Sequence, residues 1–458
     1  MVVGSKMSGI ALTVGACVAG QAFIAPAQPR APPARSPQLA AEVVAESGPR
    51  TQTCASPNAA TCLGMAAGIG GLAICMAERR ATKGKRAKAL VQMQAQPSPY
   101  DGWAHCEQYK DELLETVTAL TQPGKGLLAM DESNGTCGLR LESVGVENTE
   151  PNRQKWRQLL LGTKDLGKYC GGAILFTETL YQKTTDGKLM VELAKENGII
   201  PGIKVDTGLV DLVGGKDGEK WCRGLDDLKE RTQDYYKAGA RFAKWRTTVR
   251  VRDHSKLAVV EAAHGLARYA NICQSSGLVP IIEPEILLDG EHSIEECKET
   301  FEETWSEVFK ACADFGVQLE AVLLKPSMVT PGAQSGQSAD PATVASQTLE
   351  SLKRVVPPAV PGIMFLSGGQ SEIEATLNLN AMNQGTNPWH VSFSYARALQ
   401  NTTLKTYAGK DENVVAAQAK LLIRAMANSK AQLGEYDPAT ADEDATAAEG
   451  MYVKDYAY

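Results

Sequence analysis

Eight short apolar segments follow one another from residue 101 onward, and this repetition restricts the possible folds more than any other feature of the chain. Segments with a helical period and polar faces lie between them, namely residues 224–240, 256–277, 294–315 and 341–355. Short strands that alternate with helices are typical of a parallel sheet whose strands are buried on both faces. The expected strands are residues 126–131, 171–176, 199–206, 241–246, 278–286, 321–325, 362–367 and 390–395.

Eight repeats within about 300 residues predict an α/β fold, a closed (β/α)8 TIM barrel over residues 98–432. An open doubly wound sheet is the alternative. No G-x-G-x-x-G motif follows the first expected strand, which argues against a dinucleotide site. The tail, residues 433–458, has no hydrophobic period and is expected to be mobile, although it ends in aromatic residues.

The first hundred residues differ in charge from the rest of the chain. They hold ten Lys and Arg against three Glu, which is a net charge of +7, whereas the whole chain carries −6. The remainder therefore carries −13, and a body this acidic is a poor candidate for binding nucleic acid. The eleven cysteines include no CxxC pair, which indicates free thiols in a reducing compartment.

Residues 1–97 read as a disordered targeting leader. Lys6 precedes an apolar run at 10–20 that resembles a signal-peptide core, and Phe-Ile-Ala-Pro at 23–26 opens a stretch resembling a transit peptide. A second apolar segment, 59–77, has no charge and is followed by a basic flank. This layout resembles the plastid leaders of algae with complex plastids, dinoflagellates especially, and implies a plastid protein with no membrane segment in its mature form. The alternatives are a disordered extension with a chance apolar patch and a retained membrane anchor.

Charged side chains stand at the ends of six expected strands. In a barrel of this kind the chemistry lies at the C-terminal strand ends. Residues two apart in a strand share a face, so paired charges should point together into the barrel mouth. Buried charge without partners is costly, which favours a functional site. The charged residues are Asp131, Lys204, Asp206, Lys244, Arg246, Glu283, Glu285, Lys325 and Arg397.

Lys325 follows an apolar run, Ala-Val-Leu-Leu at 321–324. About 0.4% of free lysine is neutral near pH 8, but apolar surroundings can lower a lysine pKa by about 3–5 units. A neutral amine can form a Schiff base with a carbonyl substrate. A lysine that extends from a strand end to solvent is the simpler interpretation of this motif alone. The sequence alone does not show which of Lys325 and Lys244 is the nucleophile. Arg246 lies two residues from Lys244, and its positive charge would lower the pKa of Lys244 too.

A phosphate site is expected after the last two strands. Leu-Ser-Gly-Gly-Gln-Ser at 366–371 leads into a helix, and backbone N–H groups at a helix start bind anions. Barrels often place phosphate at this position, and Arg397 would add a bidentate contact. A Ser-Gly-Gly turn is by itself a weak signal.

Two other kinds of chemistry have little support in the sequence. None of the five histidines pairs with another at metal-ligand spacing, so no metal site is expected. No G-x-S-x-G nucleophile elbow is present.

Seven motifs, in order through residues 101–458, resemble class I fructose-1,6-bisphosphate aldolase. The resemblance is closest to the plastid form, in Tyr-Ala-Arg at 395–397 and in the tail Glu-Gly-Met-Tyr-Val-Lys at 449–454. It implies reversible cleavage of a phosphorylated sugar, no cofactor and a homotetramer. The motifs are LAMDES (128–133), GIKVD (202–206), FAKWR (242–246), EPE (283–285), LKPSMV (324–329), LSGGQS (366–371) and SYAR (394–397).

The resemblance implies catalytic roles for five residues. Lys325 would form the Schiff base, and Glu283 would shuttle protons as the imine forms and breaks. Asp131 would take the proton of the C4 hydroxyl group during carbon–carbon cleavage. Lys244 would assist imine formation as a nearby cation. Tyr458 would exchange the proton at C3 of the enamine.

The resemblance also assigns supporting and binding residues. Arg246 and Glu285 would support Lys244. The residues expected to hold the C1 phosphate are Ser367, Gly368 and Arg397. The residues expected to face the other phosphate or the sugar hydroxyls are Ser133, Thr136, Arg140 and Lys204.

The chain departs from the family pattern beside Arg140. Leu139 replaces a usual lysine, which removes a cation near the second phosphate and predicts weaker preference for a bisphosphate over a monophosphate. Thr207 and Asp211 replace lysine and proline, and Ala396 replaces the glycine of animal forms. Transaldolase, deoxyribose-phosphate aldolase and a non-catalytic scaffold are the alternative functions. The two expected phosphate sites argue against the first two alternatives. The intact set of acid, base and lysine argues against a non-catalytic scaffold.

Overall fold

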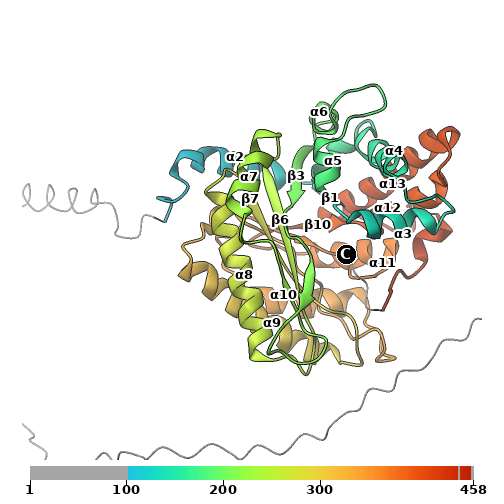
Figure 1. Ribbon diagram of the computed structural model, residues 1–458. Coiled ribbons are helices and arrows are strands. Elements are labelled where there is room, and N and C mark those ends of the chain that lie inside the picture. The colour runs from blue at the N-terminus through green and yellow to red at the C-terminus, as the bar shows by residue number, and fades with distance from the viewer. Residues whose placement is uncertain (1–101, 442–443, 455–458) are drawn as a thin grey trace, which may run out of the picture. The chain divides into compact units, whose positions relative to one another are not determined.

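The computed structural model of the chain describes residues 102–441 and 444–454. Eight parallel strands close into a barrel, so the alternative of an open sheet is wrong (Figure 1). The strands are β1 (Gly126–Met130), β2 (Cys170–Leu175), β3 (Ile200–Lys204), β6 (Phe242–Val249), β7 (Val279–Ile286), β8 (Leu323–Leu324), β9 (Gly362–Phe365) and β10 (His390–Tyr395). Their order around the barrel is β1-β10-β9-β8-β7-β6-β3-β2.

All eight expected strands are present, with small changes at their ends. β1 closes the barrel because it pairs with β2 on one side and with β10 on the other. β8 has only two residues, and Pro326 follows Lys325, so this strand has little length in which to pair. Lys325 nevertheless donates its backbone N–H to the carbonyl of Ile282 at 2.8 Å, which holds it beside β7.

Alternation along the strands separates two buried layers. Leu127 and Ala129 of β1 belong to the cluster inside the barrel, whereas Leu128 and Met130 belong to the cluster between barrel and helices. Phe242 fills the inside so closely that a Cβ at Gly202 would lie 2.2 Å from its ring. A glycine is therefore required where the β3 backbone passes this ring.

Helices surround the barrel, and α8 packs against both β6 and β7 (Figure 1). The sequence-based bounds agree with the structure for α10 and lie within four residues for α7. The α-helices are α2 (Lys110–Leu120), α3 (Asn134–Glu142), α4 (Glu150–Leu161), α5 (Thr177–Tyr181), α6 (Met190–Glu196), α7 (Leu228–Lys237), α8 (Lys256–Gln274), α9 (Ile294–Asp314), α10 (Pro341–Val355), α11 (Glu372–Met382), α12 (Arg397–Tyr407) and α13 (Val414–Gln432). The 3-10 helices are η1 (Glu107–Tyr109), η2 (Leu166–Lys168), η3 (Leu319–Ala321), η4 (Asp411–Asn413) and η5 (Ala445–Ala448).

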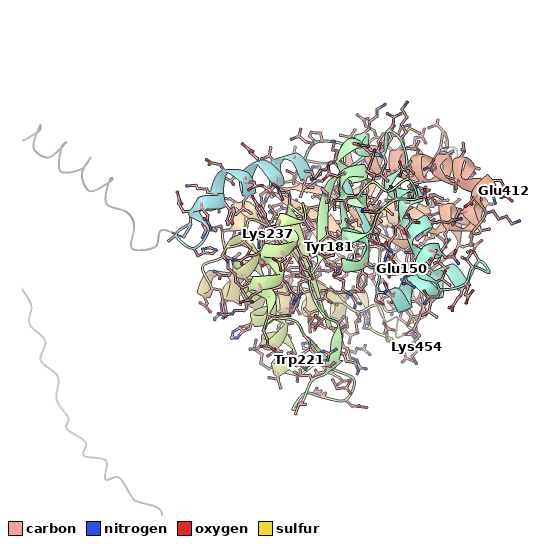
Figure 2. The ribbon with its side chains drawn as sticks, turned by 45° about the horizontal axis from the view of Figure 1, so that its top comes forward. Glu150, Tyr181, Trp221, Lys237, Glu412 and Lys454 are labelled. Atoms are coloured by element: carbon pink, nitrogen blue, oxygen red, sulfur yellow. The ribbon has the colours of Figure 1, made fainter. Side chains whose placement is uncertain are left out.

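An antiparallel hairpin that was not expected follows β3. It pairs β4 (Leu209–Asp211) with β5 (Lys220–Cys222). Trp221 of β5 lies toward the lower edge of the view in Figure 2. Each strand has three residues, which is too short for a period of two to be visible in the sequence.

The tail packs against the barrel as far as it is described. Tyr436 and Met451 are buried, and η5 lies between them. Mobility of the tail stays a prediction, and the leader lies outside the described residues. The seven cysteines in the described part are free, as expected, and all of them are buried. Within residues 102–441 and 444–454, no helix is long and apolar enough to cross a membrane.

Candidate active site

Four buried side chains meet in the mouth of the barrel and form a chain of ion pairs. Lys325 Nζ lies 3.0 Å from Glu283 Oε1. The other oxygen, Glu283 Oε2, lies 3.3 Å from Lys244 Nζ. Lys244 Nζ in turn lies 2.7 Å from Asp131 Oδ2. These residues come from four different strands or strand ends, so only the closed barrel brings them together.

The period of the strands positions these groups. Lys244 and Arg246 stand two apart on β6, and Glu283 and Glu285 stand two apart on β7, with Arg246 opposite Glu283 in the register. Lys244 reaches Glu283, and the Arg246 guanidinium donates to Glu285 Oε2. The expectation that each charged pair points the same way is therefore confirmed for these two strands.

Neighbouring positive charges keep the carboxylates of Asp131 and Glu283 ionised. Burial would raise the pKa of Asp131, but the positive charges of Lys244, Lys325 and Lys204 hold its pKa at about 2. Burial also opposes ionisation of Glu283, yet the neighbouring lysines Lys244 and Lys325 lower its pKa. The two buried carboxylates are thus stabilised as anions by the lysines that contact them.

The structure corrects the expectation for Lys244. Arg246 was expected to lower its pKa, as it would for a nucleophilic amine. Burial does act in that direction, but the carboxylates of Asp131, Glu283 and Asp206 outweigh it and raise the pKa. Lys244 is therefore held as an ammonium ion, which fits a cation better than a nucleophile.

Lys204 lies at the edge of this chain of ion pairs. Its Nζ is 3.5 Å from Asp206 Oδ1, which also accepts the backbone N–H of Gly208 at 3.2 Å. Asp206 Oδ2 is buried and has no hydrogen-bond partner within the described residues. Asp206 was seen as a strand-end charge but was given no role, although its charge acts on Lys244.

The residues expected at the second phosphate lie at the start of α3. Ser133 caps this helix: its hydroxyl accepts the backbone N–H of Thr136 at 3.2 Å and lies 3.0 Å from that residue's hydroxyl. Arg140 is buried and forms an ion pair with Glu132. Leu139 is 66% exposed, so a lysine at this position would reach solvent. Glu132 was missed, because nothing in its spacing shows that it pairs with Arg140.

The residues expected at the C1 phosphate lie between β9 and α12. Ser367 is buried, and Gly368 and Gly369 have φ angles of 55° and 87°, which favour glycine. Ser371 caps α11 in a capping box with Glu374. Arg397 opens α12, and its guanidinium donates to the carbonyl of Met451 in the tail.

The tail crosses the loop after β9, where the C1 phosphate is expected. The backbone N–H of Met451 donates to the Gly369 carbonyl at 2.9 Å. The Tyr452 hydroxyl donates to Asp289 at 2.7 Å and accepts from the Gln334 amide at 2.6 Å. The tail therefore joins the loops that follow β7, β8 and β9. Tyr458 lies outside the described residues.

A cavity of about 290 Å³ lies against the tail, and none of the four ion-paired residues lines it. Glu285, Ser327, Gly368 and Tyr452 line it, so it connects the loop that follows β9 with the end of β7. Within the described residues, no group of three or more His, Cys, Asp or Glu side chains is arranged to hold a metal ion. The absence of a metal or cofactor requirement stays a prediction.

The closed barrel and the lysine–carboxylate cluster in its mouth define a (β/α)8 barrel enzyme. The family model described as "Fructose-bisphosphate aldolase class-I" matches residues 112–458. The chain therefore belongs to the class I fructose-bisphosphate aldolase family, and it is an enzyme of this family.

Similar proteins are found among plants, green algae and parasites. The chain is 63% identical over 351 residues to fructose-bisphosphate aldolase 2, chloroplastic, of Arabidopsis thaliana, covering 76% of this chain and 87% of that protein. It is 61% identical over 352 residues to fructose-bisphosphate aldolase 1, chloroplastic, of Chlamydomonas reinhardtii, covering 77% and 93%. A fructose-bisphosphate aldolase of Plasmodium falciparum, solved with TRAP and a small molecule inhibitor, superposes with a TM-score of 0.71 at 52% identity, covering 72% and 96%.

Proposed function

We propose that this chain cleaves fructose 1,6-bisphosphate reversibly to dihydroxyacetone phosphate and glyceraldehyde 3-phosphate through a Schiff base on Lys325. The observation that carries this proposal is the chain of ion pairs from Lys325 through Glu283 and Lys244 to Asp131. An amine, a proton shuttle, a fixed cation and a second carboxylate are the groups that aldol cleavage through an imine requires.

Imine formation uses Lys325 and Glu283. Lys325 first passes one proton to Glu283, 3.0 Å from Nζ, and the neutral amine then adds to the C2 carbonyl of the open-chain sugar. A proton moves from the nitrogen to the oxygen and gives a carbinolamine. Glu283 then returns its proton to the hydroxyl group, so that water departs and an iminium ion with one N–H remains.

Carbon–carbon cleavage uses Asp131. It accepts the proton of the C4 hydroxyl group while the electron pair of the C3–C4 bond moves into the iminium ion, which leaves an enamine and releases glyceraldehyde 3-phosphate. A pKa of about 2 keeps Asp131 ionised at neutral pH, as a proton acceptor must be. The low pKa also makes it a weak base, so the iminium electron sink must supply the driving force.

The remaining step restores the amine. Tyr458 delivers a proton to C3 of the enamine, and water hydrolyses the iminium ion to free dihydroxyacetone phosphate. Asp131 releases the proton that it took from the C4 hydroxyl group, and Tyr458 regains one from solvent, so both groups return to their starting states. Lys244 stays positively charged between Asp131 and Glu283 and stabilises the oxygen anions that form nearby. Arg246 and Glu285 hold the β6 and β7 ends in register beside it.

Two phosphate groups are held at opposite sides of the mouth. Ser367, Gly368 and Arg397 bind the C1 phosphate, and Arg397 exchanges the Met451 carbonyl for the phosphate oxygens. The groups that face the second phosphate and the sugar hydroxyls are Ser133, Thr136, Arg140 and Lys204.

The chloroplastic relatives support a plastid setting. We place the protein in the stroma of an alga with a complex plastid, where it serves glycolysis, gluconeogenesis and the Calvin cycle. Residues 1–97 form the targeting leader, and the mature chain is a homotetramer.

A cleavage assay on the purified full chain tests the proposed reaction. We expect fructose 1,6-bisphosphate to give equal amounts of the two triose phosphates, with no loss of rate in EDTA. Lys325→Arg keeps the charge but cannot form an imine at neutral pH, so its rate should fall to background. Full activity of Lys325→Arg, or activity abolished by EDTA, would overturn the proposal.

A further inference from the structure

Glu178, in the short helix α5 after β2, binds three residues at once. Its Oε1 accepts from Arg153 Nε at 2.9 Å and from Arg157 Nη1 at 3.2 Å. Its Oε2 accepts from Arg153 Nη2 at 2.6 Å and from Asn134 Nδ2 at 3.1 Å. Burial would raise the pKa of Glu178, but the hydrogen bonds and charges of these partners lower it, so the carboxylate stays ionised.

These partners contact or belong to the segment that follows β1 in the candidate active site. Asn134 is the first residue of α3 and follows Ser133. Arg157 Nη2 donates to the carbonyl of Glu132 at 2.6 Å, and Glu132 follows Asp131. The segment from Asp131 to Asn134 is therefore held from α4 by Arg157 and from α5 by Glu178.

A second path reinforces the first. Arg153 Nη1 donates to Asn148 Oδ1 at 2.7 Å, and the Asn148 amide donates to the carbonyl of Asn134 at 3.2 Å. Arg157 is only 1% exposed and Arg153 is 9% exposed, so both guanidinium groups require a nearby anion. Removal of the Glu178 charge leaves these cations to repel each other directly behind α3.

We propose that Glu178 is a positioning residue that fixes the start of α3, and with it Ser133 and Arg140, for the phosphate far from C1. The inference rests on the proposed function, because it concerns the second phosphate grip of that site. Nothing in the family motifs pointed to Glu178, which lies 45 residues after Ser133 and makes no contact with the charged centre among the contacts described above.

The test compares two substrates in the Glu178→Gln variant. Glutamine keeps the size of the side chain but not its charge. We expect KM for fructose 1,6-bisphosphate to rise about tenfold, because even a misplacement of about 1 Å can cost about 100-fold. Fructose 1-phosphate lacks the second phosphate, so its kcat/KM should change by less than about threefold.

If Glu178 acted only through its charge, KM for the bisphosphate would change in the opposite direction. Glu178→Gln makes the region around α3 more positive, and a long-range effect of charge would lower KM for the bisphosphate. Asp411→Asn is the matched control. Asp411 forms an exposed ion pair, at 3.0 Å, with Lys155, which lies on the same helix α4 as Arg153 and Arg157. This control should leave both substrates unchanged.

Asn134→Ala provides a second route if Glu178→Gln does not fold. It removes one hydrogen bond of the network and should shift the ratio of the two activities in the same direction by a smaller factor. An unchanged or raised preference for the bisphosphate in a folded variant would overturn the positioning role. Loss of cleavage in the wild type would instead overturn the proposed function.

Discussion

Lys244 Nζ lies 2.7 Å from Asp131 Oδ2, and both side chains are almost fully buried. Each group sets the charge of the other: Lys244 lowers the pKa of Asp131, and Asp131 raises the pKa of Lys244. A charged pair in such a place requires further partners, because desolvation of the two ions costs several kcal/mol. Glu283 supplies one of them and extends the pair to Lys325.

Removal of the Lys244 charge should therefore disable the site without removing the nucleophile. Lys244→Met keeps the length of the side chain but leaves Asp131 and Glu283 with one cation fewer. We expect kcat to fall about 100- to 1,000-fold, the usual loss when a fixed electrostatic group is removed. Steady-state kinetics measures this, and Lys244→Arg, which keeps the charge, should retain more activity. Equal loss in both variants would show that geometry, not charge, is what Lys244 supplies.

The contribution of ionised Asp131 to the stability of the protein should be lost in acid. Its pKa is about 2 in the folded chain against an ordinary value of 3.8, so its contribution to stability is present above pH 4 and is lost as pH falls toward 2. The contribution is about 2.5 kcal/mol at most, from about 1.4 kcal/mol per pKa unit. Denaturant unfolding between pH 2 and 5 should show a shallower pH dependence for Asp131→Asn than for the wild type. Identical slopes would contradict the lowered pKa.

Leu139 should weaken the preference for a bisphosphate. Its side chain is 66% exposed beside Arg140, so Leu139→Lys adds a cation without disturbing the core. We expect the ratio of kcat/KM for fructose 1,6-bisphosphate over fructose 1-phosphate to rise about two- to fivefold, in line with about 1 kcal/mol or less for an exposed charge. Leu139→Gln is the neutral control and should leave the ratio as it is. An unchanged ratio in Leu139→Lys would sink this idea.

Tyr452 should hold the tail over the loop that follows β9. Tyr452→Phe removes the hydroxyl that bonds to Asp289 and Gln334, and each such bond contributes about 1 kcal/mol. We expect faster cleavage by a carboxypeptidase, and a lower kcat if Tyr458 acts from this tail. Val453→Ala, which changes an exposed side chain next to it, is the control. Equal digestion rates for wild type and Tyr452→Phe would show that these bonds do not restrain the tail.

The sequence predicted the barrel because its signals are local. Each strand is a short apolar run, and the alternation of Lys244 with Arg246 and of Glu283 with Glu285 places their side chains on one face. The same reasoning could not choose between Lys325 and Lys244, since the pKa of Lys244 depends on carboxylates from other strands. Glu132 and Glu178 were missed for the same reason: their arginine partners lie on neighbouring helices, and no spacing rule connects them.

Chemical trapping on the full chain tests the central claim most directly. Borohydride reduction in the presence of dihydroxyacetone phosphate converts an imine into a stable amine, and mass mapping of peptides locates it. We expect one adduct, on Lys325, in the wild type and in Lys244→Met, and none in Lys325→Arg. An adduct on Lys244 or elsewhere, or no adduct in the wild type, would contradict the Schiff base on Lys325.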